Sequence, residues 1–179
     1  MTAKMFFTDE CSTKMILHID RSIPFNPATF NHSNLLGTSR FAKMKSSKRA
    51  SDLIHTTRSL PISEIDISKI QFKNYFSEGG VLPTDGEKRL KSVRASGDNA
   101  LDAKVGQTLY EEPGQKSLNW LYENRGITSI EFAGEVLCEP VNLRHTLCLH
   151  RHGNGIWHWY YSFLGDKRYP SDFVVVFHG

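Results

Sequence analysis

Residues 144–164 read RHTLCLHRHGNGIWHWYYSFL, and this stretch decides the fold. It holds two of the three Trp, half of the eight His and one of the three Cys in the chain. Apolar and polar residues alternate on both sides of Gly153–Gly155, a pattern that is typical of β-strands. An Asn-Gly pair between two such segments is a strong signal for a hairpin. We therefore predict two antiparallel strands joined at Gly153–Gly155.

The length of the turn decides which side chains share a face of this hairpin. A two-residue turn at Asn154 and Gly155 would set His150 beside Trp159 and mix apolar with polar side chains on both faces. A three-residue loop, with Gly155 in the left-handed conformation, pairs His152 with Ile156 instead. This loop separates an apolar face from a polar face: Leu147, Leu149, Trp157, Trp159, Tyr161 and Phe163 on the first, and Cys148, His150, His152, His158 and Tyr160 on the second. We favour the three-residue loop, because burial of one apolar face selects the register.

Helical patterns occupy residues 84–124 and come before the hairpin in the chain. A first helix is predicted from Thr84 or Asp85 through Arg94, with its basic residues facing outward: Lys88, Arg89, Lys91 and Arg94. A second helix is predicted to start at Asp98 or Asn99, because Leu101, Val105 and Leu109 then form one apolar stripe. A third short helix is predicted between a cap at Ser117 and a stop at Gly126.

Period-two patterns follow Gly126 and indicate strands. Residues 127–132 and 136–138 are predicted to flank a turn at Ala133 and Gly134, and Phe173–Phe177 is predicted as a strand buried on both faces. Shorter strands are predicted within residues 15–20 and 62–72. Helices followed by antiparallel strands indicate an α+β fold. We expect an antiparallel β-sheet covered on one face by two or three short helices, as a single domain over residues 15–179 after a disordered extension at residues 1–14.

Composition bounds the class of protein. The chain has 179 residues, of which 39% are hydrophobic and 23% charged, with a net charge of +3. These values suit one globular domain with its own core. No apolar run approaches the ~20 residues of a membrane span. Cys11, Cys138 and Cys148 form no CxxC motif, which indicates reduced thiols and predicts a cytoplasmic protein.

Residues 31–60 form a basic segment, which we expect to be a loop. Its cationic residues stand against a single acid, Asp52, and five of them are the candidate nucleic-acid-binding residues: Arg40, Lys43, Lys45, Lys48 and Arg49. A basic arm can bind phosphate groups without reading a base sequence. The same composition also suits a solvated loop with no partner, which is the interpretation we favour.

The polar face of the predicted hairpin carries the residues with the most chemistry. His150 and His158 are cross-strand partners in the favoured register, with Cβ atoms roughly 5 Å apart, and Cys148 lies one step along the same face. Imidazole and thiolate groups are zinc ligands, so Cys148, His150 and His158 are a candidate metal site. A neighbouring His could also lower the pKa of the Cys148 thiol and create a nucleophile. The alternative is a half-exposed strand face without a ligand.

Two further groups of residues have a functional and a structural interpretation. The acids Glu131, Glu135 and Glu139 alternate along one strand, and period two is expected to leave them on one rim in water, with nothing to raise a pKa. The aromatic face of the hairpin could serve as a stacking platform for bases or sugars. We expect these aromatic residues to form the core instead, because exposing them together would promote aggregation.

Four segments of the chain carry a resemblance to a known group of proteins. They are IDRSIPFNPATF, LDAKVGQTLYEE, SLNWLYENRGITSIEFAGEVL and RHTLCLHRHGNGIWHWYYSFL. This succession resembles a group of small uncharacterised bacterial proteins in which a helical segment is followed by a Trp/Tyr-rich β-hairpin tail. The resemblance covers residues 15–30 loosely and residues 100–164 better. It implies a shared fold unit and supplies no catalytic residues.

Three functions follow from these patterns. The first expectation is a non-enzymatic binding or interaction protein with no cofactor. The second is a small metal-dependent or thiol hydrolase that uses Cys148, His150 and His158, with zinc as its metal. The third is a nucleic-acid-binding module that uses the basic segment.

Overall fold

The computed structural model describes residues 14–25, 27, 54–56, 61–75, 86–138, 144–169 and 171–177, with residues 54–56 as backbone alone. Three α-helices are present in these ranges: α1 (Gly86–Ser96), α2 (Ala103–Glu111) and α3 (Lys116–Arg125). The strands are β1 (Ile16–His18), β2 (Ile54–Thr56), β3 (Glu64–Asp66), β4 (Gln71–Lys73), β5 (Asn99–Ala100), β6 (Ser129–Cys138), β7 (Arg144–Arg151), β8 (Trp157–Phe163) and β9 (Phe173–Phe177).

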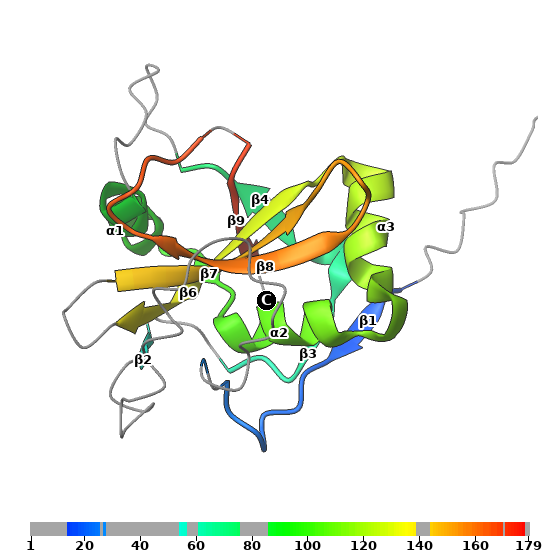
Figure 1. Ribbon diagram of the computed structural model, residues 1–179. Coiled ribbons are helices and arrows are strands. Elements are labelled where there is room, and N and C mark those ends of the chain that lie inside the picture. Colours follow the sequence, from blue (N-terminus) through cyan, green and yellow to red (C-terminus); the bar gives the residue numbers. More distant parts are fainter. Residues whose placement is uncertain are drawn as a thin grey trace, which may run out of the picture.

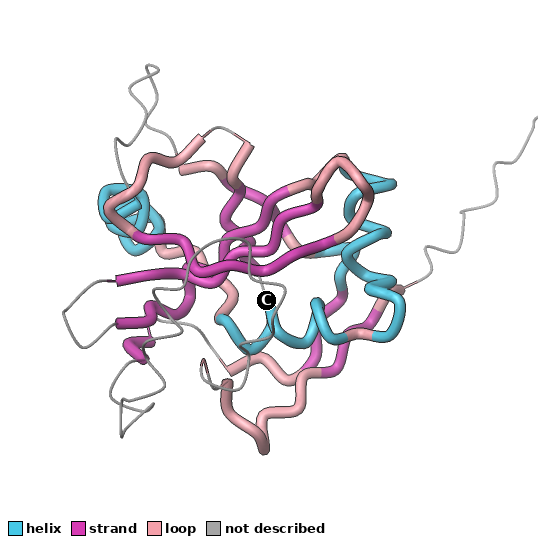
Figure 2. The backbone as a smooth tube through the Cα atoms, viewed as in Figure 1, coloured by secondary structure: helices cyan, strands magenta, loops and turns pink. Residues whose placement is uncertain are grey.

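The main sheet places its strands in the order β4-β9-β6-β7-β8, with β2 paired to β6 and β5 paired to β9. All of its pairs are antiparallel except β6 and β9, which run parallel. Strands β1 and β3 form a separate antiparallel pair. Figures 1 and 2 show the long strands β6, β7 and β8 crossing the middle of the molecule, with helices on either side of them. The α+β class is therefore confirmed.

Two helices cover one face of the sheet, as predicted. Side chains of α2 and α3 pack in one cluster with side chains of β6, β7 and β8: Val105, Leu109, Leu118, Leu121, Ile130, Phe132, Leu147, Leu149, Trp157 and Trp159. Helix α1, which was predicted beside them, packs instead in a second cluster on the other face. There Leu90 and Val93 contact the cluster that contains Val174 and Val176 of β9. Strand β9 is thus buried on both faces, as its unbroken apolar run predicted.

The hairpin has the three-residue loop. The backbone N–H of His152 donates to Ile156 over 2.9 Å, and Gly155 has a φ of 85°. Leu149 pairs with Trp159 and His150 pairs with His158. Trp157, Trp159 and Tyr161 are buried, so the aromatic face is core and offers no stacking platform.

Strand β6 differs from its prediction. A turn was expected at Ala133 and Gly134, but the strand continues through both residues, and its register against β7 shifts between Phe132 and Leu137. The reason is a close approach of backbones, because the N–H of Gly134 donates to Leu101 over 2.9 Å. A Cβ atom at position 134 would lie 2.3 Å from the carbonyl oxygen of Ala100, so the position requires glycine.

The second helix also begins later than predicted. Asn99–Ala100 forms strand β5, and Asp102 caps α2 by accepting from the N–H of Val105 over 3.1 Å. The third helix ends at Gly126, as predicted, with a φ of 66°.

Several predictions fall on residues that the structure does not describe. They are the N-terminal extension, apart from its last residue, and the candidate nucleic-acid-binding residues Arg40, Lys43, Lys45, Lys48 and Arg49. Within the segment predicted as a basic loop, the backbone of Ile54–Thr56 forms β2 and pairs with Leu137, Val136 and Glu135 of β6.

Candidate functional site

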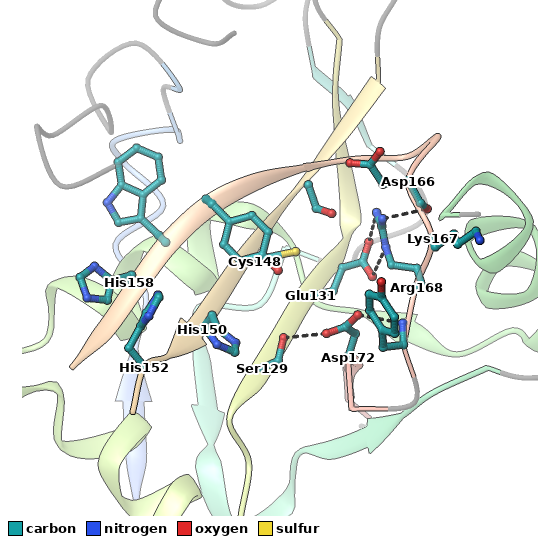
Figure 3. Close-up of a pocket in the computed structure, with 14 residues that line it drawn as sticks. Ser129, Glu131, Cys148, His150, His152, His158, Asp166, Lys167, Arg168 and Asp172 are labelled. Carbon is teal, nitrogen blue, oxygen red and sulfur yellow. Dashed lines mark hydrogen bonds and ion pairs between the residues drawn. The ribbon is translucent and has the colours of Figure 1, made fainter. Parts of the chain in front are cut away.

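A pocket of about 650 Å³ lies on the face of the sheet opposite α2 and α3. Strands β6, β7 and β8 supply its floor, and the segment between β8 and β9 supplies one wall. Figure 3 shows three histidines at one end of the pocket, and Glu131, Arg168 and Asp172 at the other, with Cys148 between the two groups. The polar side of the predicted hairpin is therefore the floor of a pocket.

His150, His152 and His158 form the histidine cluster. The ring centroids of His150 and His152 are 5.1 Å apart and those of His152 and His158 are 4.6 Å apart, with interplanar angles of 86° and 80°. Burial lowers the pKa of His150, and the charge of His152 lowers it further, against an opposite effect of Asp172. In the part of the chain that the structure describes, the buried Nδ1 atom of His158 has no hydrogen-bond partner.

The opposite end of the pocket is built on Glu131, which is 3% exposed. The guanidinium group of Arg168 donates to both carboxylate oxygens of Glu131 over 3.3 Å, and Arg89 of α1 approaches the same carboxylate at 3.4 Å. The hydroxyl of Thr146 donates to it over 2.6 Å. Burial alone would raise the pKa of Glu131, but these two cations and this hydrogen bond hold it below the usual value. Glu131 therefore remains ionised in the core.

Arg168 also fixes the wall of the pocket. Its Nη1 atom donates to the carbonyl oxygens of Phe163 and Asp166 over 3.0 and 3.3 Å. Arg89 donates to the carbonyl oxygen of Asp172, so the two arginines hold the segment between β8 and β9 at both ends. The Glu131–Arg89–Arg168 cluster thus ties this wall to β6 and α1.

Three pocket-lining groups that could act as nucleophiles, Cys148, Ser129 and Tyr160, are not activated. Burial, together with the charge of Glu131, raises the pKa of the Cys148 thiol to about 12. The Ser129 hydroxyl donates to the carboxylate of Asp172 over 3.3 Å rather than to an imidazole. The charge of Cys148 and burial raise the pKa of Tyr160. The lowered thiol pKa that the hairpin pattern suggested is therefore wrong, because burial and the anionic Glu131 both disfavour the thiolate.

The structure brings the three predicted metal ligands, Cys148, His150 and His158, into the same pocket. Among the described residues, however, no group of three or more His, Cys, Asp and Glu side chains is arranged to hold a metal ion. Zinc binding stays a prediction.

Sequence reasoning missed the partners that complete the pocket. Arg89 was expected to face outward from α1, but it is 1% exposed, because Glu131 on the sheet face beneath α1 offers it an ion pair. Arg168 and Asp172 lie in a segment without periodicity. The only sequence feature that could have identified them is their charge, in a short connection between two apolar strands.

The expectation that the acids of β6 lie on one rim in water is also wrong. Glu131 and Glu135 are both buried, and Glu139 lies outside the described residues. Because the register shifts after Phe132, Glu135 points to the α2 side, where its carboxylate accepts from the N–H of Ala103 over 3.2 Å. Burial and the charge of Asp102 raise the pKa of Glu135 to about 7.

No helix in the described ranges is long and apolar enough to cross a membrane. Comparisons of the chain with models of protein families, with curated proteins and with solved structures find no match.

Proposed function

We propose that this protein is a non-enzymatic binding protein, and that its ligand is a small polar molecule held in the pocket above β6, β7 and β8. The observation that carries the proposal is the pocket itself, a cavity of about 650 Å³ whose lining includes histidine, serine, carboxylate and arginine side chains. This volume lies within the range of ~300–1,000 Å³ that small-molecule sites occupy. The Glu131–Arg89–Arg168 cluster holds the segment that forms one wall of this cavity.

Two features favour binding over covalent catalysis. The Cys148 thiol is protonated at neutral pH, since its pKa is raised to about 12. Ser129 hydrogen-bonds to Asp172, so no imidazole withdraws its proton. We place the protein in the cytoplasm, because Cys138 and Cys148 are free thiols.

A pocket-filling substitution tests the proposal. Ser162 lines the pocket from β8 and is half-buried, so Ser162→Trp places an indole in the cavity. A library of small polar compounds should include members that shift the NMR signals of His150, Tyr160 and Asp172 in the unaltered protein. These shifts should disappear in Ser162→Trp and persist in the control Ser92→Trp, which alters an exposed position of α1. Identical shifts in both variants, or no shifts in the unaltered protein, would contradict the proposal.

The same preparation discriminates the hydrolase alternative. Metal analysis of the purified protein and titration of its thiols with iodoacetamide should give substoichiometric zinc and a slow Cys148. Stoichiometric zinc, or a thiol that reacts far faster than free cysteine at neutral pH, would favour the hydrolase function over the binding function.

A further inference from the structure

No side-chain hydrogen bond joins His150, His152 or His158 to another residue within the described ranges, and their contacts are with each other's rings. The Nδ1 atom of His158 is buried in that state. A buried polar atom without a partner is costly, so a ligand group that pairs with this nitrogen would offset that cost.

Two of the three carboxylates that line the pocket, those of Glu131 and Asp172, are already paired, whereas the third, Asp166, lies at the exposed rim. Both carboxylate oxygens of Glu131 accept from Arg168. Those of Asp172 accept from the Ser129 hydroxyl and from the N–H of Tyr169. The carboxylates of Glu131 and Asp172 are therefore occupied, whereas the imidazole N–H groups of the histidine cluster donate to no side chain among the described residues. A neutral imidazole supplies one N–H donor and a protonated imidazole supplies two.

We infer that the histidine cluster binds a phosphate group, either inorganic phosphate or the phosphate of a small phosphomonoester. This inference rests on the proposed function and names the chemistry of its ligand. Three imidazoles offer three separate N–H groups, which match the three terminal oxygens of a phosphomonoester, or three of the four oxygens of inorganic phosphate, better than the two oxygens of a carboxylate. A cationic ligand would find Glu131 and Asp172 already paired and only Asp166, at the exposed rim beside Lys167, open to it.

An NMR titration with inorganic phosphate at neutral pH tests the inference. Sodium phosphate should shift the imidazole signals of His150, His152 and His158, relative to sodium chloride at equal ionic strength. His18 is the internal control, because its side chain is 77% exposed on β1 beside Glu64, outside the pocket. Equal shifts of all four histidines, or shifts that sodium chloride reproduces, would overturn the inference.

Substitutions at His158 separate hydrogen bonding from packing. His158→Phe keeps a flat ring against His152 but removes both nitrogens, and phosphate affinity should fall about tenfold or more. His158→Gln keeps an N–H donor and should retain more affinity than His158→Phe. His18→Phe should leave affinity unchanged. Because His158 is half-buried, His152→Phe serves as the second variant if His158→Phe does not fold. Unaltered phosphate affinity in the folded variant would overturn the inference.

A parallel titration with a phosphomonoester distinguishes the two sources of the phosphate group. Glycerol phosphate that binds more tightly than inorganic phosphate assigns the pocket to an ester, and the reverse order assigns it to the free anion. If uncharged compounds of the library shift pocket signals and neither phosphate does, the inference fails and the proposed function stands. If no compound of any class shifts them, both fail.

Discussion

Glu131 and Glu135 lie on the same strand, β6, and both are buried, yet their carboxyl groups have opposite pKa shifts. Glu131 lies between two arginines, which hold its pKa below the usual value. Glu135 lies beside Asp102, whose own partner is Arg21 at 2.7 Å, and its pKa rises to about 7. The comparison shows that burial alone does not determine whether these carboxyl groups are ionised. The number of neighbouring arginine side chains determines it.

The irregular register of β6 separates the two carboxyl groups in space. In a regular strand, residues 131 and 135 would share a face. The shift after Phe132 leaves Glu131 on the pocket face and turns Glu135 to the N-terminus of α2. One strand therefore supplies a permanent charge to the pocket and a carboxyl group that titrates near neutral pH on the other face.

The largest expected effect is the loss of the Glu131 charge. Glu131→Gln leaves Arg89 and Arg168 buried without their anion, which should lower the free energy of unfolding by about 3–5 kcal/mol. Denaturant unfolding at neutral pH measures the loss. The control is Glu87→Gln, which removes an acid that is 37% exposed and pairs with Arg144 at 2.9 Å. That change should cost under about 1 kcal/mol, and equal losses would show that the buried cluster is no stronger than a surface pair.

A smaller loss of stability is expected from Gly134→Ala, which adds a methyl group at the point where the register of β6 shifts. The new Cβ atom would lie 2.3 Å from the carbonyl oxygen of Ala100 and 2.7 Å from the carbonyl carbon of Leu101, so the connection between β5 and α2 must shift. We expect a loss of about 1–3 kcal/mol in the free energy of unfolding.

Gly153→Ala is the matched control for this change. No atom lies within 4 Å of a Cβ atom at position 153, and the residue lacks a positive φ. The free energy of unfolding of Gly153→Ala, measured in the same denaturant series, should differ from that of the unaltered protein by under about 0.5 kcal/mol. A Gly134→Ala variant as stable as Gly153→Ala would show that β6 does not depend on this close approach.

The hairpin could be predicted from the sequence because its information is local. Burial of Trp157, Trp159 and Tyr161 on one face selects a single register, and that register also places His150 opposite His158. The same reasoning failed on β6. Alternation over Glu131 and Glu135 assumes a regular strand, and the contact between Gly134 and Leu101 that breaks the regularity comes from a different part of the chain.

The pocket could be predicted only in part, for the same reason. Cys148, His150 and His158 share a strand pair, so their common face follows from period two. Arg89 and Arg168 reach Glu131 from α1 and from the segment after β8. An ion pair between such distant residues leaves no periodic signal, and Arg89 alone has the pattern of a solvated helix position.

The last variant is Glu135→Gln, whose effect should be smallest at low pH, because it changes the pH dependence of stability. The ordinary pKa of this carboxyl group is 4.5 and its folded value is about 7, so between these values the folded protein holds a proton that the unfolded chain has released. Its contribution to stability is therefore complete below about pH 4.5 and is lost as the pH rises through about 7. Over this window the free energy of unfolding should fall by about 1–3 kcal/mol.

The amide that Glu135→Gln introduces is neutral at every pH, so the variant should match the unaltered protein at low pH and exceed it in stability above about pH 7. The groups that face Glu135 are Asp102, the N–H of Ala103, Arg21 and Tyr161. The measurement must compare the free energies of unfolding of the two proteins at each pH, because His150 makes the stability of both proteins change with pH in the opposite direction. Its folded pKa lies below the ordinary value of 6.5, so the stability that it contributes is lost as the pH falls. If the difference in free energy of unfolding between the two proteins stays constant from pH 4.5 to pH 7, Glu135 is ionised in the folded protein. Arg21 would then stabilise the carboxylates of both Asp102 and Glu135.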